Sequence, residues 1–215
     1  STAVSGNSVD VGAIPVPLFE AFMETALEDR LLDSAASVMI TTPELKTRIP
    51  FSRLPALKHL LLLGSVDHPE DGFKGKRLDY HAEMSSVSDR LEPVWLKLDD
   101  GLVIHYTSGS TGKSKGVLHR QYAMVGHYQT SKWALDLRED DVYWCTADPG
   151  WVTGTSYGIY GPWTLGISSV VIGGRFSAER WYQTIEKYGV SMWYSAPTAF
   201  RMLMAQGKET AKKSN

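Results

Sequence analysis

The residues best suited to chemistry in this 215-residue sequence form the string YTSGSTGKSKGV, at 106–117. Its glycines allow a tightly curled backbone whose N–H groups can converge on an anion. Its hydroxyl side chains can donate hydrogen bonds to phosphate oxygens, and its lysines add positive charge. This predicted phosphate-binding loop comprises Thr107, Ser108, Gly109, Ser110, Thr111, Gly112, Lys113 and Lys115.

The string fits the P-loop pattern G-x-x-x-x-G-K-[ST] only in part. Gly112, Lys113 and Ser114 match its end, but Thr107 occupies the position of the first glycine. The glycines also fail to give the spacing G-x-G-x-x-G. A P-loop NTPase is therefore disfavoured but stays an alternative, as does a plain surface loop for the part rich in serine and glycine.

Other residues that could do chemistry are better explained by structural roles. His119 and His127 are eight positions apart, too far for the i, i+4 metal pair of a helix. The single Cys145 rules out an intrachain disulfide and a cysteine-rich metal site, and no local base accompanies it. We predict no metal site built from protein side chains. His105 and Cys145 are predicted to have structural roles, and His119 and His127 to pack or to form hydrogen bonds.

Alternating strands and helices must position the loop. Strands are predicted at 38–41, 57–63, 102–107, 142–147, 168–172 and 191–194, and helices at 21–35, 122–135, 178–188 and 198–205, with Ser177 as an N-cap. Residues 12–18 are predicted as an extended run or strand, and 64–100 as a loop with one short helix near 82–91. This order predicts an α/β fold, a layered α-β-α domain with a largely parallel sheet. In such sheets ligands bind after the carboxyl ends of strands, where the loop at 107–116 begins.

Composition and charge exclude some classes of binding partner. A net charge of −2 and a pI near 6.3 do not indicate a nucleic-acid surface or an anionic membrane as partner. No segment reaches about 18 consecutive apolar residues, and the first ten residues lack the pattern of a signal peptide. We therefore expect a cytoplasmic protein with small-molecule partners.

The string at 106–117 closely resembles YTSGTTGKPKGV, the signature of the acyl-adenylate-forming enzymes, with Ser110 and Ser114 as mild departures. The later segments LHRQYAMVGHYQT, ADPGWVTGTSYGIYGPWTLG and WYSAPTAFRMLM are similar to AMP-forming acetyl-CoA synthetases, in the same order. The resemblance extends over nearly the whole chain from about Val11. It implies part of the N-terminal domain of that family.

The resemblance implies a ligase reaction in two steps. Acetate attacks the α-phosphate of ATP to give acetyl-adenylate and pyrophosphate, and the thiol of CoA then takes the acetyl group as AMP leaves. The loop residues would hold the β- and γ-phosphates, with Mg²⁺ bridging phosphate oxygens. Trp151, Val152 and Thr153 would line the acetate pocket, with Val152 against the methyl group; a helix start packed into the core is the alternative for Val152.

The resemblance also predicts how the chain is organised. Residues 1–10 are expected to be a polar leader, native or artificial, and residues 11–215 part of the ATP- and acyl-binding domain. Motifs expected for adenine and ribose, and a C-terminal domain with a catalytic lysine, are not found, so no catalytic residue is predicted here. We expect this fragment to be inactive alone and to form a homo-oligomer through apolar surfaces that truncation exposes. Alternatives are another short- or medium-chain acyl-CoA ligase, an adenylation domain, or a phosphate-binding module without catalysis.

Overall fold

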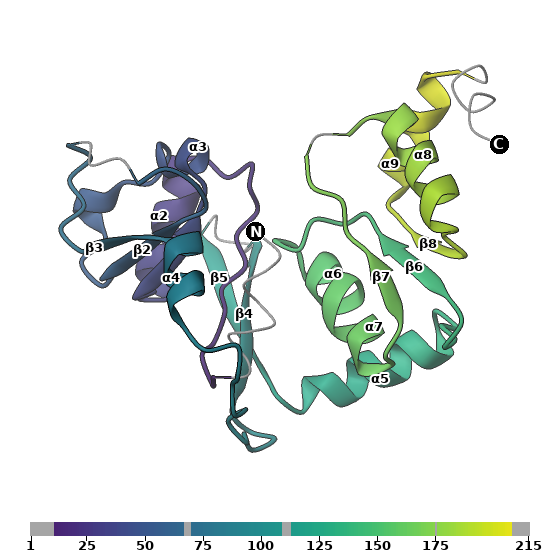
Figure 1. Cartoon of the computed structure of the whole chain (residues 1–215), viewed down its shortest axis with the longest axis horizontal. Coiled ribbons are helices and arrows are strands. Elements are labelled where there is room, and N and C mark those ends of the chain that lie inside the picture. The colour runs from purple at the N-terminus through teal and green to yellow at the C-terminus, as the bar shows by residue number, and fades with distance from the viewer. Residues whose placement is uncertain (1–10, 67–69, 109–112, 175, 208–215) are drawn as a thin grey trace. The chain divides into compact units, whose positions relative to one another are not determined.

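The computed structural model describes residues 11–66, 70–108, 113–174 and 176–207, and the chain divides into two compact units (Figure 1). Unit 1 comprises Ser1–Gln121 and unit 2 comprises Tyr122–Asn215. Each unit contains a parallel three-stranded sheet with helices of its own. The prediction of a mixed α/β fold with parallel sheets is thereby confirmed.

Unit 1 is built on a parallel sheet with the strand order β1-β2-β3. Its strands are β1 (Val38–Thr41), β2 (His59–Leu62) and β3 (Lys76–Asp79). β1 and β2 match predicted strands, and Met39 lies opposite Leu60 in the ladder. β3 lies in a segment predicted as a loop, because its letters KRLD include a single apolar residue and give no strand signal.

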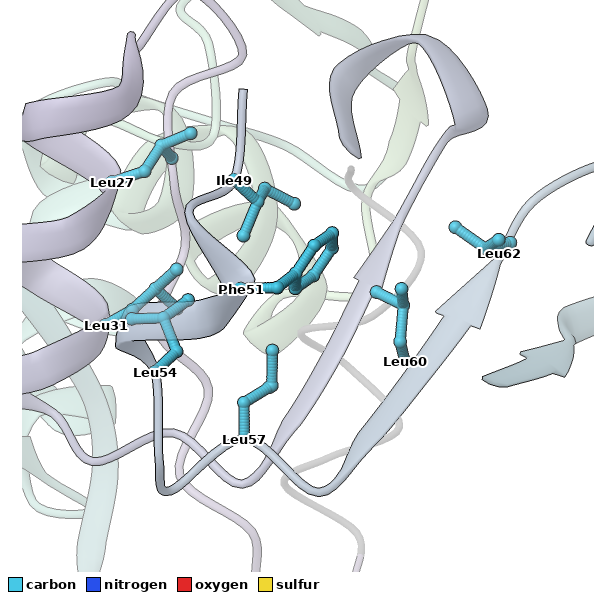
Figure 2. Packing of buried hydrophobic residues seen from close by; sticks show 8 residues of the cluster. All are labelled: Leu27, Leu31, Ile49, Phe51, Leu54, Leu57, Leu60 and Leu62. Atoms are coloured by element: carbon cyan, nitrogen blue, oxygen red, sulfur yellow. The ribbon is translucent and has the colours of Figure 1, made fainter. Parts of the chain in front are cut away.

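The core of unit 1 gathers around α2 (Glu24–Asp33) and β2 (Figure 2). Leu27 and Leu31 lie one turn apart on α2 and are both buried, as an amphipathic helix requires. Leu60 and Leu62 alternate along β2 and are completely buried. The buried cluster consists of Leu27, Leu31, Ile49, Phe51, Leu54, Leu57, Leu60 and Leu62. α2 is shorter than the predicted helix at 21–35.

Short helices join the strands of unit 1. They are α3 (Pro43–Lys46), the 3-10 helix η1 (Phe51–Arg53) and α4 (Tyr80–Ser86). The carboxylate of Asp79 accepts a hydrogen bond from the N–H of Ala82 at 2.8 Å, which caps α4 at its start. The helix predicted near 82–91 therefore begins and ends earlier than expected.

An antiparallel hairpin of β4 (Gly101–Ser108) and β5 (Ser114–Arg120) completes unit 1. β4 confirms the predicted strand at 102–107. Part of β5 occupies residues predicted as loop, so the expected loop at 107–116 is shorter than the sequence suggested. The pairing is antiparallel because a short connection can join antiparallel neighbours, whereas parallel neighbours need a long crossover.

The run at 12–18 was predicted as extended or strand, and it forms no strand. It still contacts the hairpin, because the carbonyl oxygen of Pro15 accepts a hydrogen bond from the N–H of Ile104 at 3.0 Å. The prolines in this run cannot donate ladder hydrogen bonds, which limits it to isolated contacts of this kind.

Unit 2 has β6 (Val142–Cys145) between β7 (Ser168–Val170) and β8 (Met192–Tyr194), and all pairings are parallel. Successive side chains of β6 point to opposite faces of the sheet. The Cys145 side chain lies against η2, the π-helix at Ser156–Tyr160, while Trp144 packs edge-on against Trp181 of α8 (Ala178–Tyr188). Helices therefore cover both faces, which is the predicted α-β-α layering.

The helices of unit 2 match the sequence prediction in part. α5 (Ala123–Trp133), α8 and α9 (Pro197–Ala205) lie at predicted positions, and Ser177 caps α8 as expected by accepting a hydrogen bond from the N–H of Arg180. The helical segment of α6 (Val152–Thr155), η2 and α7 (Gly161–Thr164) was not predicted, because glycine and proline are poor helix formers. Within the described ranges, no helix has the length and apolar character needed to cross a bilayer.

Candidate functional site

The predicted phosphate-binding residues lie at the end of the β4–β5 hairpin, whose base is buried. Leu102, Val103 and His105 on β4 are exposed by 0%, 1% and 2%. Gln121 closes this base: its backbone N–H donates to the carbonyl of Asp100 at 2.9 Å, and its Nε2 donates to the carbonyl of Gly101 at 3.1 Å. The hairpin is thus anchored at one end.

The other end of the hairpin presents its side chains to solvent. Thr107, Lys113 and Lys115 are exposed, and Thr107 lies opposite Lys115 in the ladder. Ser108 ends β4 and pairs with Ser114. Gly109, Ser110, Thr111 and Gly112 lie outside the described residues. The described part of the predicted loop therefore brings one hydroxyl and two ammonium groups to the same end of the hairpin.

A side-chain hydrogen bond joins the hairpin to α2. Tyr106, directly before Thr107, donates its hydroxyl to Oδ2 of Asp33 at 2.7 Å. Burial and, next, this hydrogen bond raise the pKa of Tyr106 to about 12, so the hydroxyl remains a donor at neutral pH. Asp33 was not identified from the sequence, because it is 73 positions from Tyr106 and no local pattern marks the contact.

Gly116 makes this contact possible. It lies opposite Tyr106 in the ladder, and a Cβ atom at Gly116 would lie 3.2 Å from Oδ2 of Asp33 and from two ring carbons of Tyr106. A real side chain would crowd both groups. The last glycine of the string therefore has a packing role, which its place in a predicted phosphate-binding loop did not indicate.

The second predicted site lies in the turn between β6 and α6. Oδ1 of Asp148 accepts a hydrogen bond from the N–H of Gly150 at 2.7 Å, and the carbonyl of Asp148 accepts one from the N–H of Trp151 at 2.9 Å. The hydroxyl of Thr155 donates to the carbonyl of Pro149 at 2.5 Å. Backbone and side-chain hydrogen bonds together define the course of this turn.

Gly154 allows α6 to pass directly over the turn. A Cβ atom at Gly154 would lie 2.0 Å from the carbonyl oxygen of Asp148 and 2.7 Å from that of Ala147. The residues predicted for the acyl pocket are Trp151, directly before α6, and Val152 and Thr153 in its first turn; all three are exposed. Val152 begins α6, as the helix-start alternative predicted, and its side chain is 38% exposed.

Two hydroxyl groups that were not singled out from the sequence meet beside this turn. Oγ1 of Thr146 and Oγ of Ser195 lie 2.5 Å apart, just beyond the carboxyl ends of β6 and β8. The N–H of Thr146 also donates to the carbonyl of Tyr194 at 3.0 Å. This is the edge at which parallel sheets bind ligands.

Residues predicted to have structural roles occupy packed positions. Burial raises the pKa of the Cys145 thiol, which keeps it protonated and unreactive. The rings of His105 and His119 meet edge to face with centroids 5.4 Å apart, and His127 stacks on Tyr160. Nowhere in the part of the chain that the structure describes do three His, Cys, Asp or Glu side chains lie close enough to hold a metal ion.

A cavity of about 520 Å³ lies elsewhere in unit 2, between β7 and α8. Val170, Arg180 and Lys187 are among the residues that line it. Trp151, Val152 and Thr153 are not, so this cavity is separate from the predicted acyl pocket.

Comparison with known proteins identifies the family of the chain. It matches the family model of AMP-binding enzymes over residues 8–215. It is 55% identical over 207 residues to the acetyl-coenzyme A synthetase of Bacillus subtilis (strain 168), covering 96% of this chain and 36% of that protein. It is 37% identical over 220 residues to the acetyl-coenzyme A synthetase of Methanothrix thermoacetophila, covering 95% and 33% respectively. The chain thus spans about a third of the length of the curated relatives it matches.

The fold agrees with a solved structure as well. The crystal structure of Brucella canis acyl-CoA synthetase is similar with a TM-score of 0.84 at 33% sequence identity, covering 96% of this chain and 37% of that one. The family match includes both the string predicted to bind phosphate and the turn at Trp151. The chain therefore belongs to the AMP-binding enzyme family.

Proposed function

We propose that this chain supplies the phosphate-binding hairpin and the acyl-binding turn of an AMP-forming acetate–CoA ligase. The observation that carries the proposal is the 55% identity to an acetyl-coenzyme A synthetase over 96% of the chain. A carboxylate oxygen of acetate would attack the α-phosphorus of ATP, and pyrophosphate would leave. The sulfur of CoA would then attack the acyl carbon, and AMP would leave.

The hairpin would meet the main electrostatic demand of the first step. Two anions must approach each other, so catalysis depends on alignment and charge neutralisation more than on a protein nucleophile. The exposed ammonium groups of Lys113 and Lys115 would attract the β- and γ-phosphates, and the Thr107 hydroxyl would donate to a phosphate oxygen. Ser108 and residues 109–112 belong to the same proposed site.

The proposal includes Mg²⁺, which would enter the site bound to ATP. When bound, it would neutralise charge on the phosphates through oxygen ligands. The Thr107 hydroxyl is an oxygen donor of a type that suits this hard cation, and it is exposed beside Lys115. The ion would otherwise take its ligands from phosphate oxygens and water.

The turn would hold the acid. Trp151 and Val152 offer exposed apolar surface to a methyl group, and Thr153 offers a hydroxyl to the carboxylate. The two hydrogen bonds that Asp148 accepts stabilise this turn. A small acid can be selected by such apolar walls, although one methylene changes selectivity only about 10- to 200-fold.

Pyrophosphate–ATP exchange tests the proposal. It should be measured with acetate, propionate, butyrate and no acid, on the 215-residue chain and on the longest gene product that contains it. We expect acetate-dependent exchange from the longer protein and none from the 215-residue chain. Absence of acid-dependent exchange in both would contradict the proposal. Faster exchange with butyrate than with acetate would instead favour the broader acyl-CoA ligase alternative, which the likeness to the Brucella canis enzyme supports.

We also propose that the chain self-associates through exposed apolar side chains. Trp95 is 96% exposed and Trp133 is 72% exposed. Large aromatic side chains left in water favour association. Sedimentation equilibrium measures the mass directly, and a monomer at high protein concentration would contradict this part of the proposal.

A further inference from the structure

We propose that the hydrogen bond between Tyr106 and Asp33 is a positioning contact that holds the phosphate-binding hairpin ready for ATP. Tyr106 and Asp33 touch no substrate in this proposal, and they act through Thr107 and Lys115. The inference rests on the proposed function, because the ligand of the hairpin is taken to be the phosphates of ATP.

The place of Tyr106 in the ladder is the first support. Successive side chains of a strand point to opposite faces of the sheet. Because the Tyr106 ring turns toward α2, the side chain of Thr107 turns away from it. Tyr106 lies opposite Gly116, and the next pair along the ladder is Thr107 with Lys115. The residue that is hydrogen-bonded to Asp33 therefore lies directly next to the pair, Thr107 and Lys115, that we propose to bind phosphate.

The exposure of the hairpin is the second support. On β4, burial by the core extends as far as His105, and Thr107 is exposed. Tyr106 lies at the transition, where its 2.7 Å hydrogen bond links the strand to a helix that belongs to the core of unit 1. A hydrogen bond to a charged acceptor is stronger than one between neutral groups. The contact therefore restrains the part of the hairpin that the core does not cover.

The position of Asp33 is the third support. It is the last residue of α2, and the C-terminus of a helix favours cations over carboxylates. Helix stability therefore does not explain an acid here. The group that contacts this carboxylate is the Tyr106 hydroxyl, which donates to it at 2.7 Å. What Asp33 contributes is the link to the hairpin.

The lack of a side chain at Gly116 completes the arrangement. The space above Gly116 is filled by the Tyr106 ring and the Asp33 carboxylate, each 3.2 Å from where a Cβ would lie. A side chain at this position would meet both partners. The bare backbone of Gly116 therefore leaves free the space that the ring and the carboxylate occupy.

The test uses the variants Tyr106→Phe, Asp33→Ala and Asp33→Asn, together with the double variant Tyr106→Phe/Asp33→Ala. The first readout is backbone amide hydrogen exchange of β5 and of β2 in the 215-residue chain. The second is KM for ATP against kcat, from pyrophosphate–ATP exchange by the longer gene product. Tyr128→Phe is the matched control, because it removes a phenol hydroxyl from an exposed position on α5.

We expect Tyr106→Phe and Asp33→Ala each to speed amide exchange in β5 about tenfold and to raise KM for ATP about tenfold, with a smaller change in kcat. The double variant should be no worse than the worse single variant, because both remove the same contact. Asp33→Asn should lie between these variants and the wild type, because its amide oxygen still accepts a hydrogen bond. Exchange in β2 and all properties of Tyr128→Phe should stay unchanged.

Each other outcome overturns the inference. Equal acceleration in β2 and β5 would show that the contact stabilises unit 1 as a whole. Wild-type exchange rates in β5 for both single variants would show that the contact does not restrain the hairpin. Effects that add in the double variant would mean that the two residues act separately. If the wild type shows no acid-dependent exchange, the proposed function fails, and the amide exchange of β5 still decides whether the contact positions the hairpin.

Discussion

The two candidate sites of this chain are held in place in different ways. The hairpin of unit 1 is linked to α2 by the side-chain hydrogen bond from Tyr106 to Asp33, and a Cβ atom at Gly116 would lie 3.2 Å from both side chains. The turn of unit 2 depends on backbone atoms, because α6 approaches so closely that a Cβ at Gly154 would lie 2.0 Å from the carbonyl oxygen of Asp148. Side chains can shift by a few tenths of an ångström, whereas a backbone carbonyl inside a turn moves only with its neighbours.

This difference suits the ligands proposed for each site. Attraction between ammonium groups and phosphates falls off slowly with distance, so small adjustments of the hairpin cost little binding. Recognition of one small acid depends on walls that do not move, because one methylene changes the binding free energy by only about 1–3 kcal/mol. An adjustable phosphate site and a rigid acyl turn are therefore what the proposed reaction needs.

The largest effect should come from the rigid site. We expect Gly154→Ala to destabilise unit 2 by about 3 kcal/mol or more, because the new methyl group overlaps two backbone carbonyl oxygens. Urea unfolding followed by tryptophan fluorescence measures this loss. The control is Gly126→Ala on the exposed side of α5, where nothing lies within 4 Å of the new methyl. That change should stabilise the helix by about 0.5–1 kcal/mol. Similar stabilities for the two variants would contradict the rigid description of the turn.

The next effect should appear in activity without a change in stability. We expect Lys113→Ala and Lys115→Ala in the longer gene product to lower kcat/KM for ATP about 10- to 100-fold, because each removes a charge that we propose to face the phosphates. Thermal unfolding should be unchanged, since both side chains are exposed. Lys97→Ala removes another exposed lysine of unit 1 and should leave both measurements unaltered. Full activity in the two hairpin variants would contradict the proposal that these lysines bind the phosphates of ATP.

A smaller effect should follow from Gly116→Ala, the counterpart of Gly154→Ala in the adjustable site. The added methyl meets a ring and a carboxylate at 3.2 Å, and both can yield slightly. We expect the free energy of unfolding to change by less than about 1 kcal/mol, while KM for ATP rises as the Tyr106 contact is displaced. A loss of stability as large as that of Gly154→Ala would erase the distinction between the two sites.

The smallest effect concerns pH. The pKa of Tyr106 is raised from its ordinary 10.0 to about 12, because folding buries the phenol and gives it the Asp33 acceptor. A raised pKa means that the contribution to stability is complete below about pH 10 and is lost as the pH rises toward 12. We expect the wild type to lose stability over this range faster than Tyr106→Phe. Burial also raises the pKa of Tyr143 and Tyr160, so the difference between wild type and variant is the quantity to measure.

Elements with strong local signals could be predicted from the sequence. α8 begins after the capping Ser177 and ends at Gly189, whose φ of +59° favours glycine, and the structure places the helix where these residues indicate. β1 and β4 follow from short apolar or β-branched runs. These signals act over a few residues, so the elements that they predict do not depend on contacts with distant parts of the chain.

Other elements depended on contacts that no local pattern reveals. β5 carries serine, lysine and glycine at its start, and pairing with β4 makes it a strand. The helical segment of α6, η2 and α7 contains glycines that are poor helix formers. Two of them, Gly154 and Gly161, sit where a side chain would collide with Asp148 or Ser131. Close packing explains these glycines better than local propensity does.

The family of the chain could be predicted from the sequence itself. Hydroxyl, glycine and lysine residues in one string are typical of phosphate sites, and the resemblance to the family rested on the same residues; that they bind phosphate stays a prediction. The tertiary structure alone decided that Asp33 is the partner of Tyr106 across 73 positions, and that Gly154 must lack a side chain. Residue types carry chemical capability locally, whereas partners distant in sequence are chosen by the packing of whole helices and strands.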